Sequence, residues 1–410
     1  MSVPYAIPVA PDEIVRDLTA SERVRRAFRF FEEQSESINE EHARICSIPA
    51  PPFGESERAE YLRARLVECG LAGARLDAEG NCVALRSGRE ERPLLVVSAH
   101  LDTVFPSGTD CAVRLDAAGR MRAPGVADDG CGLAALIALA KVLEECEIET
   151  RGSLLFVGTV GEEGEGNLRG VRHLLTEGEW AGRVDAFVSL DGPGLERVTN
   201  AALASRRYRV RCLGAGGHSW GDFGVANPVH ALGRCVARLA AYPAPKRPRT
   251  TFNVGRIEGG CGVNVIPREA SMDVDLRSEA VEELMRLDAF FRRAAREAAE
   301  DENASRRAGT PPLELDVRLI GDRPGGETSE EQPLVRLALE ATGAVGAKAF
   351  LDCSSTDSNI AIARGIPAVT IGAGGASGNT HTLDEWYDPR GRDLGLKRAL
   401  LVALGTVGVG

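Results

Sequence analysis

The sequence predicts an α/β fold in which a domain with a mostly parallel sheet is interrupted by a smaller, two-layer α+β domain. Apolar segments typical of strands covered on both faces alternate with helical segments in the first half of the chain. Near Ser205 the order changes to β-α-β-β-α-β, and after about Gly321 the first rhythm resumes. A chain of 410 residues with 43% hydrophobic content can bury two cores. We therefore expect a first domain formed by residues 1–204 and 323–410, with residues 205–322 inserted.

In the first part, an amphipathic helix over about Ser21–Cys46 is predicted to end at the prolines of residues 49–52. A second helix, Ser56–Cys69, ends at Gly70. The predicted elements that follow are the strand Pro93–Ala99, the helix Gly130–Glu145 and the strands Ser153–Val160 and Val184–Leu190.

The predicted insertion begins with a strand at Arg206–Leu213. Its other elements are the helix Asn227–Tyr242, the strands Thr250–Ile257 and Glu269–Arg277, the helix Glu279–Asn303 and the strand Leu313–Ile320. Apolar and charged residues alternate in the strand Glu269–Arg277, so one face of it packs and the other presents charge. The last part carries the helix Leu334–Thr342, the strand Ala368–Ile371 and the helix Leu396–Leu404.

Composition excludes several classes of protein. A net charge of -11 argues against a nucleic-acid groove or an anionic membrane surface, so we expect neither partner. The stretch Met1–Phe30 has no sustained apolar core, which predicts no signal peptide or membrane anchor and hence a cytoplasmic protein. Ten cysteines without a C-x-x-C pair indicate reduced, mostly buried thiols rather than disulfides or a thiolate metal site.

Acidic residues and histidines follow several of the predicted strands. Because open α/β sheets collect their ligands at the carboxyl ends of strands, residues distant in sequence can meet there. Oxygen and imidazole ligands, together with a carboxylate able to bridge two cations, predict a two-metal hydrolytic site. The candidate residues are His100, Asp102, Asp128, Glu162, Glu163, Asp191 and His381.

Six segments of the chain combine these residues with glycines and small residues, namely Ser98–Val104, Pro124–Gly130, Gly158–Gly164, Leu190–Gly192, Gly216–Ser219 and Asn379–His381. They resemble the two-zinc exopeptidases and deacylases that include peptidase T, glutamate carboxypeptidase, acetylornithine deacetylase and aminoacylase. Each segment alone is a weak signal, but six in the family's order span essentially the whole chain. The resemblance implies a zinc-exopeptidase-like catalytic domain and a ferredoxin-like insertion that serves as lid and dimerisation domain.

Asp128 is the candidate for the carboxylate that bridges the two metals. The resemblance implies that His100 and Asp191 complete one metal site, and that Glu163 and His381 complete the other. It also implies that Asp102 orients the His100 imidazole, that Glu162 is the general base, and that the peptide bond between Asp128 and Asp129 is cis.

Each of these signals has a simpler explanation when taken alone. A Glu-Glu pair at a helix start is usually a solvated pair favoured by the helix dipole, and Asp128-Asp129 before a helix suits a cap. A single histidine is more often structural than a ligand, and we assign that role to His42, His173 and His230. The joint occurrence of the other residues in family order favours the metal site.

Three residues of the predicted insertion match family positions that contact substrate. His218 follows a glycine-rich turn, and in dimeric relatives the matching histidine reaches the neighbouring subunit's site and stabilises the oxyanion. Asn264 and Arg277 could hold a substrate amide and carboxylate. Alternatively, His218 is incidental to a flexible turn, and Arg277 pairs with Asp273 or Asp275 on its own strand face.

The sequence therefore predicts a metal-dependent hydrolase of amide bonds in small peptides, most similar to a di- or tripeptide aminopeptidase. An N-acyl amino-acid deacylase or a carboxypeptidase is the alternative, and a catalytically silent metal-binding homologue is a remote one. Two zinc ions are the expected cofactors, although cobalt or manganese would suit the same ligands. We also expect a homodimer formed through the inserted domain.

Overall fold

The computed structural model describes residues 10–410, and their contacts divide the chain into two compact units. Unit 1 comprises the chain up to Ala202 together with Glu327–Gly410, and unit 2 comprises Leu203–Gly326. Unit 2 is thus an insertion in the sequence of unit 1. Each unit has its own sheets and its own hydrophobic core.

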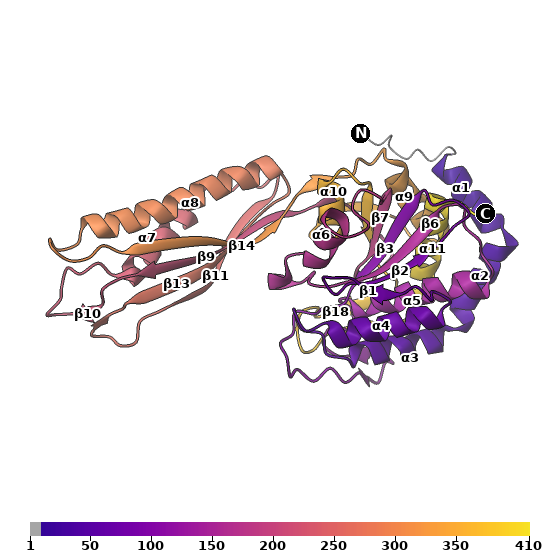
Figure 1. The fold of residues 1–410 in the computed structure, drawn as a ribbon, viewed down its shortest axis with the longest axis horizontal. Coiled ribbons are helices and arrows are strands. Elements are labelled where there is room, and N and C mark those ends of the chain that lie inside the picture. The colour runs from indigo at the N-terminus through magenta and orange to yellow at the C-terminus, as the bar shows by residue number, and fades with distance from the viewer. Residues whose placement is uncertain (1–9) are drawn as a thin grey trace. The chain divides into compact units, whose positions relative to one another are not determined.

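Unit 1 alternates helices and strands along most of its length (Figure 1). Its helices are α1 (Pro11–Ala20), α2 (Glu22–Glu33), α3 (Ser35–Cys46), α4 (Ser56–Glu68), α5 (Gly130–Glu145), α6 (Arg169–Thr176), α9 (Pro333–Ala344), α10 (Ser358–Ala363) and α11 (Arg392–Val407), with a short 3-10 turn at Gly164–Gly166. Its strands are β1 (Arg75–Leu76), β2 (Cys82–Arg86), β3 (Leu94–His100), β4 (Arg114–Leu115), β5 (Met121–Arg122), β6 (Ser153–Thr159), β7 (Ala186–Leu190), β8 (Arg197–Ala202), β16 (Phe350–Ser354), β17 (Ala368–Ile371), β18 (Ala376–Gly378) and β19 (Trp386–Asp388), and β15 (Gly326–Glu327) lies at the boundary.

The central sheet follows the order β1-β2-β6-β3-β7-β17-β8-β15, with β16 paired to β8. Its middle strands β6, β3, β7 and β17 are mutually parallel, whereas β2 and β8 pair antiparallel with β6 and β17. This confirms the predicted mostly parallel sheet. A smaller sheet, β18-β19-β5-β4, lies within the same unit.

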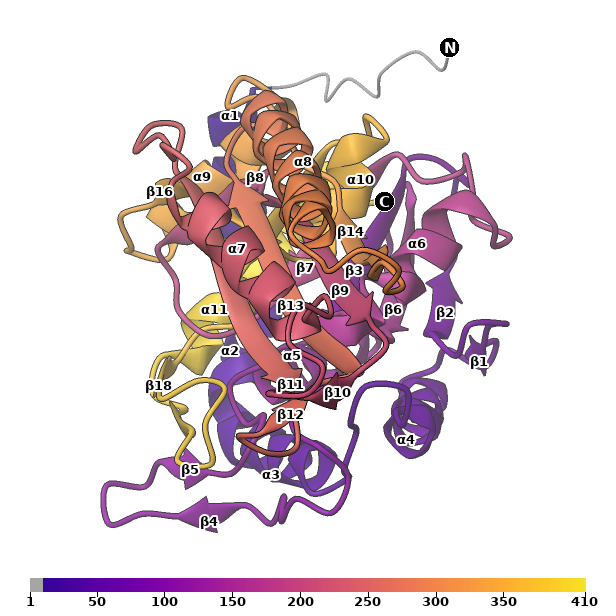
Figure 2. The same ribbon diagram turned by 90° about the vertical axis from the view of Figure 1, so that its left-hand side faces the viewer.

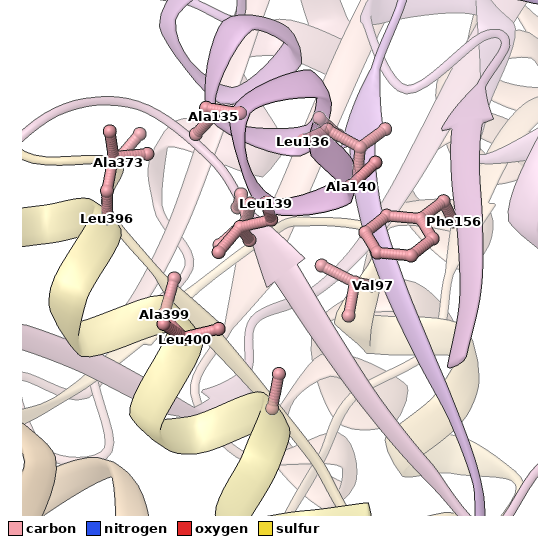
Figure 3. Close-up of a cluster of buried hydrophobic side chains, with 14 of the residues drawn as sticks. Val97, Ala135, Leu136, Leu139, Ala140, Phe156, Ala373, Leu396, Ala399 and Leu400 are labelled. Atoms are coloured by element: carbon pink, nitrogen blue, oxygen red, sulfur yellow. The ribbon is translucent and has the colours of Figure 1, made fainter. Parts of the chain in front are cut away.

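Helices cover both faces of the central sheet, because alternate residues of a strand point to opposite faces. Leu95, Val97 and Ala99 of β3 join the cluster that contains α5 and α11. Figure 3 shows part of this cluster, with Val97 and Phe156 from the strands facing Leu136 and Ala140 of α5. Residues of β3 with the other parity, among them Leu94, pack in a second cluster with α6 and α10. Burial on both faces explains why these strands read as continuous apolar runs.

Unit 2 has the predicted order β-α-β-β-α-β, with a short ribbon added. Its elements are β9 (Ala204–Leu213), β10 (Gly217–His218), α7 (Pro228–Ala240), β11 (Thr250–Gly259), β12 (Val265–Ile266), β13 (Glu269–Ser278), α8 (Val281–Ala304) and β14 (Glu314–Arg323). The antiparallel sheet has the order β11-β13-β9-β14, and α7 and α8 pack on one face of it (Figure 2). Alternate residues of β13 are buried against these helices, as the sequence predicts.

One predicted element is wrong. The single helix expected over Ser21–Cys46 is two helices, α2 and α3, separated at Gln34, whose φ of -94° and ψ of 12° interrupt the helical backbone. The two helices pack on different neighbours, since α2 contacts both α11 and α5 whereas α3 packs mainly on α5. Periodicity alone does not reveal such a break, because the apolar stripe continues across it.

Within residues 10–410, every helix is too short or too polar to cross a membrane. The sequence prediction that no leader or anchor is present falls partly on residues 1–9, which lie outside the described residues.

Candidate metal and catalytic site

The candidate site lies at the carboxyl edge of the central sheet in unit 1. The strands β6, β3 and β7 are parallel neighbours, so the segments that follow them leave the sheet side by side. His100 is the last residue of β3, Glu162 and Glu163 follow β6, and Asp191 follows β7. The fold therefore brings together four residues from three segments that are distant in the sequence.

Two loops bring further candidate residues to this edge. Asp128 lies two residues before the start of α5. His381 lies in the loop between β18 and β19, and its φ of 66° places it in the left-handed region that non-glycine residues rarely adopt. The loop thus holds His381 in one defined backbone conformation.

The Asp128 carboxylate faces two imidazoles with its two oxygens. Oδ1 lies 2.8 Å from His100 Nε2, and Oδ2 lies 3.0 Å from His381 Nε2. His381 Nε2 is also 2.9 Å from Glu163 Oε1. One carboxylate between two separate imidazoles is the arrangement that a bridging ligand of two metal ions requires.

Three groups of side chains could each hold a cation, because their ligand atoms lie within 4.8 Å of one another. Asp128 belongs to two of these groups, as a bridging ligand must. The groups are His100 with Asp128 and Asp191, Asp128 with Glu163 and His381, and His100 with Glu162 and Glu163. Nitrogen and carboxylate oxygen donors in sets of three fit zinc and similar divalent metals.

The charges at the site also fit bound cations. Burial, followed by the charge of Asp128, raises the pKa of Asp191 to about 6. Hydrogen bonds with Asp128 and Glu163 raise the pKa of His381 to about 10. The buried carboxylates therefore favour positive charge at this edge of the sheet. Divalent ions would supply that charge in place of the protons.

The Asp102 carboxylate holds the loop that carries Glu162 and Glu163. It accepts the backbone N–H of Glu162 at 2.9 Å and that of Glu163 at 2.8 Å. The hydrogen bond to His100 Nδ1 is made by the Asp102 backbone carbonyl at 3.0 Å, while carboxylate Oδ1 lies 3.7 Å from the same nitrogen. Asp102 thus contacts both the imidazole and the neighbouring loop, the second of which the sequence did not indicate.

Asp129 connects three segments of the site. The peptide bond between Asp128 and Asp129 is cis, as the family resemblance implies. The buried Asp129 carboxylate accepts backbone N–H groups of Gly132 at 3.0 Å, Gly192 at 3.1 Å and His100 at 3.2 Å. A Cβ atom at position 132 would lie 2.3 Å from Asp129 Oδ1, so a glycine is required there. Asp129 is therefore more than the helix cap that its position suggests.

Glu385 is a support that the sequence did not reveal. Its carboxylate is fully buried and accepts four backbone N–H groups, those of Ala127 at 2.7 Å, Asp128 at 3.1 Å, and Gly125 and His381 at 3.3 Å each. It joins the loop of Asp128 to the loop of His381. The only signal in the sequence is an acidic residue four positions after a candidate ligand, which is too common to be informative.

Asp357 is a second buried carboxyl group that the sequence left unnoticed. The Thr159 hydroxyl donates to its Oδ2 at 2.5 Å and also lies 3.3 Å from the carbonyl oxygen of Ala99, the residue before His100. Asp357 Oδ1 is buried and makes no hydrogen bond to any described residue. Burial raises the pKa of Asp357 to about 6.

His42 belongs to none of the three groups of candidate ligands. It is fully buried, with Nε2 2.6 Å from the Val126 carbonyl oxygen and Nδ1 2.5 Å from the Arg392 guanidinium. Because the guanidinium can only donate, Nδ1 accepts and Nε2–H donates to Val126. His42 therefore supports the backbone before Asp128.

The other three predicted site residues belong to unit 2. His218 ends β10, which pairs with β12, and the Asn264 carbonyl accepts the Ser219 N–H at 3.0 Å. These contacts place Asn264, the residue just before β12, next to the turn that follows His218. Arg277 lies on β13 and donates to Asp275 Oδ2 at 2.6 Å, which is the pairing that the sequence left as an alternative to substrate binding.

Comparisons with known proteins found similar sequences. A model of Peptidase family M20/M25/M40 matches residues 96–403. The uncharacterised protein YqjE of Bacillus subtilis is 26% identical over 356 residues, which are 82% of this chain and 89% of YqjE. A succinyl-diaminopimelate desuccinylase of Leptothrix cholodnii is 29% identical over 226 residues, which are 51% of this chain and 57% of that enzyme.

Two solved structures share the fold. Aminopeptidase PepT from Bacillus cereus matches with a TM-score of 0.71 at 19% identity, covering 91% of this chain and 98% of PepT. YxeP of Bacillus subtilis, a dinuclear metal-binding peptidase, matches with a TM-score of 0.65 at 18% identity, covering 92% of this chain and 99% of YxeP.

Proposed function

Because the chain belongs to Peptidase family M20/M25/M40, we propose that this hydrolase cleaves amide bonds in small peptides, as a di- or tripeptide aminopeptidase. The observation that carries the proposal is the Asp128 carboxylate, whose two oxygens face His100 and His381. Such a pair of oxygens can serve two metal ions at once. We infer that both ions are zinc, with cobalt or manganese able to replace it.

His100 and Asp191 would complete one metal site, and Glu163 and His381 the other, with Asp128 shared. When bound, a pair of divalent cations supplies Lewis acidity and lowers the pKa of a water molecule. The Asp102 and Glu385 carboxylates hold the loops of these ligands by their backbone N–H groups, so the ligands need little reorganisation on binding.

Glu162 is the proposed general base. Its side chain is buried, and one of its carboxylate oxygens lies within 4.8 Å of ligand atoms of His100 and Glu163. Glu162 takes a proton from the water that attacks the scissile carbonyl and delivers it to the leaving amine. The hydrogen bond from its backbone N–H to Asp102 keeps it at the edge of the site.

Unit 2 would supply the remaining contacts. We assign His218 to the oxyanion, Asn264 to a substrate amide and Arg277 to a substrate carboxylate, although Arg277 would first have to leave Asp275. We also propose that two copies associate through unit 2 and that His218 acts across this dimer. A monomer in sedimentation measurements would contradict that arrangement.

The aminopeptidase assignment rests on the resemblance of Gly158–Glu163 and Leu190–Gly192 to peptidase T, and the fold of PepT supports it. The desuccinylase relative supports the alternative of an N-acyl amino-acid deacylase, for which the same catalytic residues would serve. Cysteines without disulfides suit the cytoplasm, which we propose as the location.

A mixed panel of dipeptides, tripeptides and N-acyl amino acids, analysed by mass spectrometry after incubation with zinc-loaded protein, tests the proposal. We expect loss of N-terminal residues with the native protein and none with Glu162→Gln. Glu165→Gln, an exposed neighbour on the same loop, is the matched control and should stay active. Release of acyl groups or C-terminal residues would favour the alternative, and metal binding without any hydrolysis would favour a silent homologue.

A further inference from the structure

His218 lies in a tight turn that contacts one of its two ring nitrogens. The backbone N–H of Trp220 points to His218 Nδ1 at 3.2 Å, and that of Gly221 points to the same nitrogen at 3.3 Å. Both groups can only donate, so Nδ1 must be the acceptor. A neutral imidazole that accepts at Nδ1 carries its proton on Nε2.

Asp222 closes this turn from the other side. Its Oδ2 accepts the backbone N–H of His218 at 2.8 Å, and its own N–H donates to the His218 carbonyl at 2.9 Å. A Cβ atom at position 217 would lie 2.7 Å from Asp222 Oδ2, so a glycine at that position leaves room for this side chain. The hydrogen bond from the Ser219 N–H to the Asn264 carbonyl ties the turn to the residue just before β12.

We propose that the N–H groups of Trp220 and Gly221 fix His218 in the tautomer with its proton on Nε2, and that Asp222 is the positioning residue that maintains this turn. The His218 side chain is exposed, and the ring nitrogen that the two backbone N–H groups contact is Nδ1. Toward a substrate, His218 is then a hydrogen-bond donor at Nε2 and cannot accept a proton there. This part of the inference rests on the proposed function, in which His218 meets an oxyanion.

The consequence for catalysis is specific. An oxyanion needs donors that are already oriented when the negative charge develops. If the tautomer were free to exchange, part of the His218 population would present a lone pair to the oxyanion and repel it. The turn removes that population, so the side chain that meets the oxyanion presents a donor at Nε2.

Long-range ¹H–¹⁵N spectra of the full-length protein labelled at histidine test the tautomer directly, with the His218 signals assigned by their loss in His218→Gln. We expect a protonated Nε2 and an unprotonated Nδ1 in the native protein and in Asp222→Asn, because an amide oxygen can still accept the His218 N–H. Asp222→Ala should show a mixture of tautomers. Asp316→Ala, an exposed position on β14, is the control.

Kinetics on a substrate from the peptide panel give the second readout. We expect Asp222→Ala to lower kcat roughly tenfold with little change in KM, and Asp222→Asn to restore it. A native spectrum with the proton on Nδ1 would overturn the inference, as would an Asp222→Ala spectrum and kcat equal to those of the native protein. If the native protein hydrolyses nothing in the panel, the proposed function fails, while the spectra still decide the tautomer.

Discussion

Replacing Glu385 by glutamine should weaken both metal binding and folding, because one carboxylate accepts four backbone N–H groups. Oε1 accepts those of Ala127 and Asp128 at 2.7 and 3.1 Å, and Oε2 accepts those of Gly125 and His381, both at 3.3 Å. Glutamine keeps one acceptor oxygen and places an NH₂ group against the other pair of donors. We expect the carbonyl oxygen to take the shorter pair and the longer pair to be lost.

The size of the effect follows from these contacts. A hydrogen bond to a charged acceptor contributes about 1.5 kcal/mol at the low end of its range, so the loss of two lowers the free energy of unfolding by about 3 kcal/mol. The loops of Asp128 and His381 also lose their common anchor. Loss of a support behind metal ligands reduces metal affinity by roughly 10- to 100-fold.

Competition with a chromophoric chelator measures the zinc affinity, and calorimetric unfolding of metal-free protein measures stability. Asp384→Asn is the matched control, because it makes the same chemical change at the preceding, exposed position. The reasoning would be refuted if the free energy of unfolding of Glu385→Gln lay within about 0.5 kcal/mol of that control and its zinc affinity within about twofold.

Three further changes test other parts of the site. Asp102→Asn removes an acceptor from the N–H of Glu162 or Glu163 and should lower kcat/KM by roughly 10- to 100-fold, and a native value would argue against that support. Asp357 has a pKa of about 6 in the folded state, above its ordinary 3.8, so its stabilising effect is complete below pH 3.8 and is lost as the pH rises through 6. In metal-free native protein, the free energy of unfolding should therefore fall between pH 5 and pH 8 by roughly 1.5 kcal/mol more than it does in metal-free Asp357→Asn. Urea titrations at each pH measure both profiles, and parallel profiles would contradict this prediction. Chelation should lower the melting temperature, and zinc at 100 times its Kd should restore about 2.7 kcal/mol per site, whereas Asp128→Asn should respond little.

The sequence predicted the elements of the fold well where one physical signal dominates. β3 and β6 are apolar throughout because both faces are covered, and β13 alternates because only one face is. The break at Gln34 could not be predicted, because it depends on which neighbours α2 and α3 pack against.

The residues of the candidate site also differ in whether the sequence could predict them. Residues that follow a buried strand, such as His100 and Asp191, could be placed at one edge from the order of elements alone. Glu385 and Asp357 could not, because they are buried by loops whose path has no periodic signal. Their importance lies in the hydrogen bonds that they accept, from backbone N–H groups at Glu385 and from the Thr159 hydroxyl at Asp357, and the sequence does not say which donor a carboxylate will meet.

Unit 2 leaves and re-enters unit 1 at neighbouring strands, since β8 and β15 lie side by side at one end of the central sheet. The candidate ligands follow β3, β6 and β7, or lie in loops of unit 1, so none of them depends on the length of the segment between Ala202 and Glu327. A change in the length of unit 2 therefore leaves the candidate ligands of unit 1 in place, whereas the residues proposed to meet the substrate, His218, Asn264 and Arg277, lie within the segment that changes.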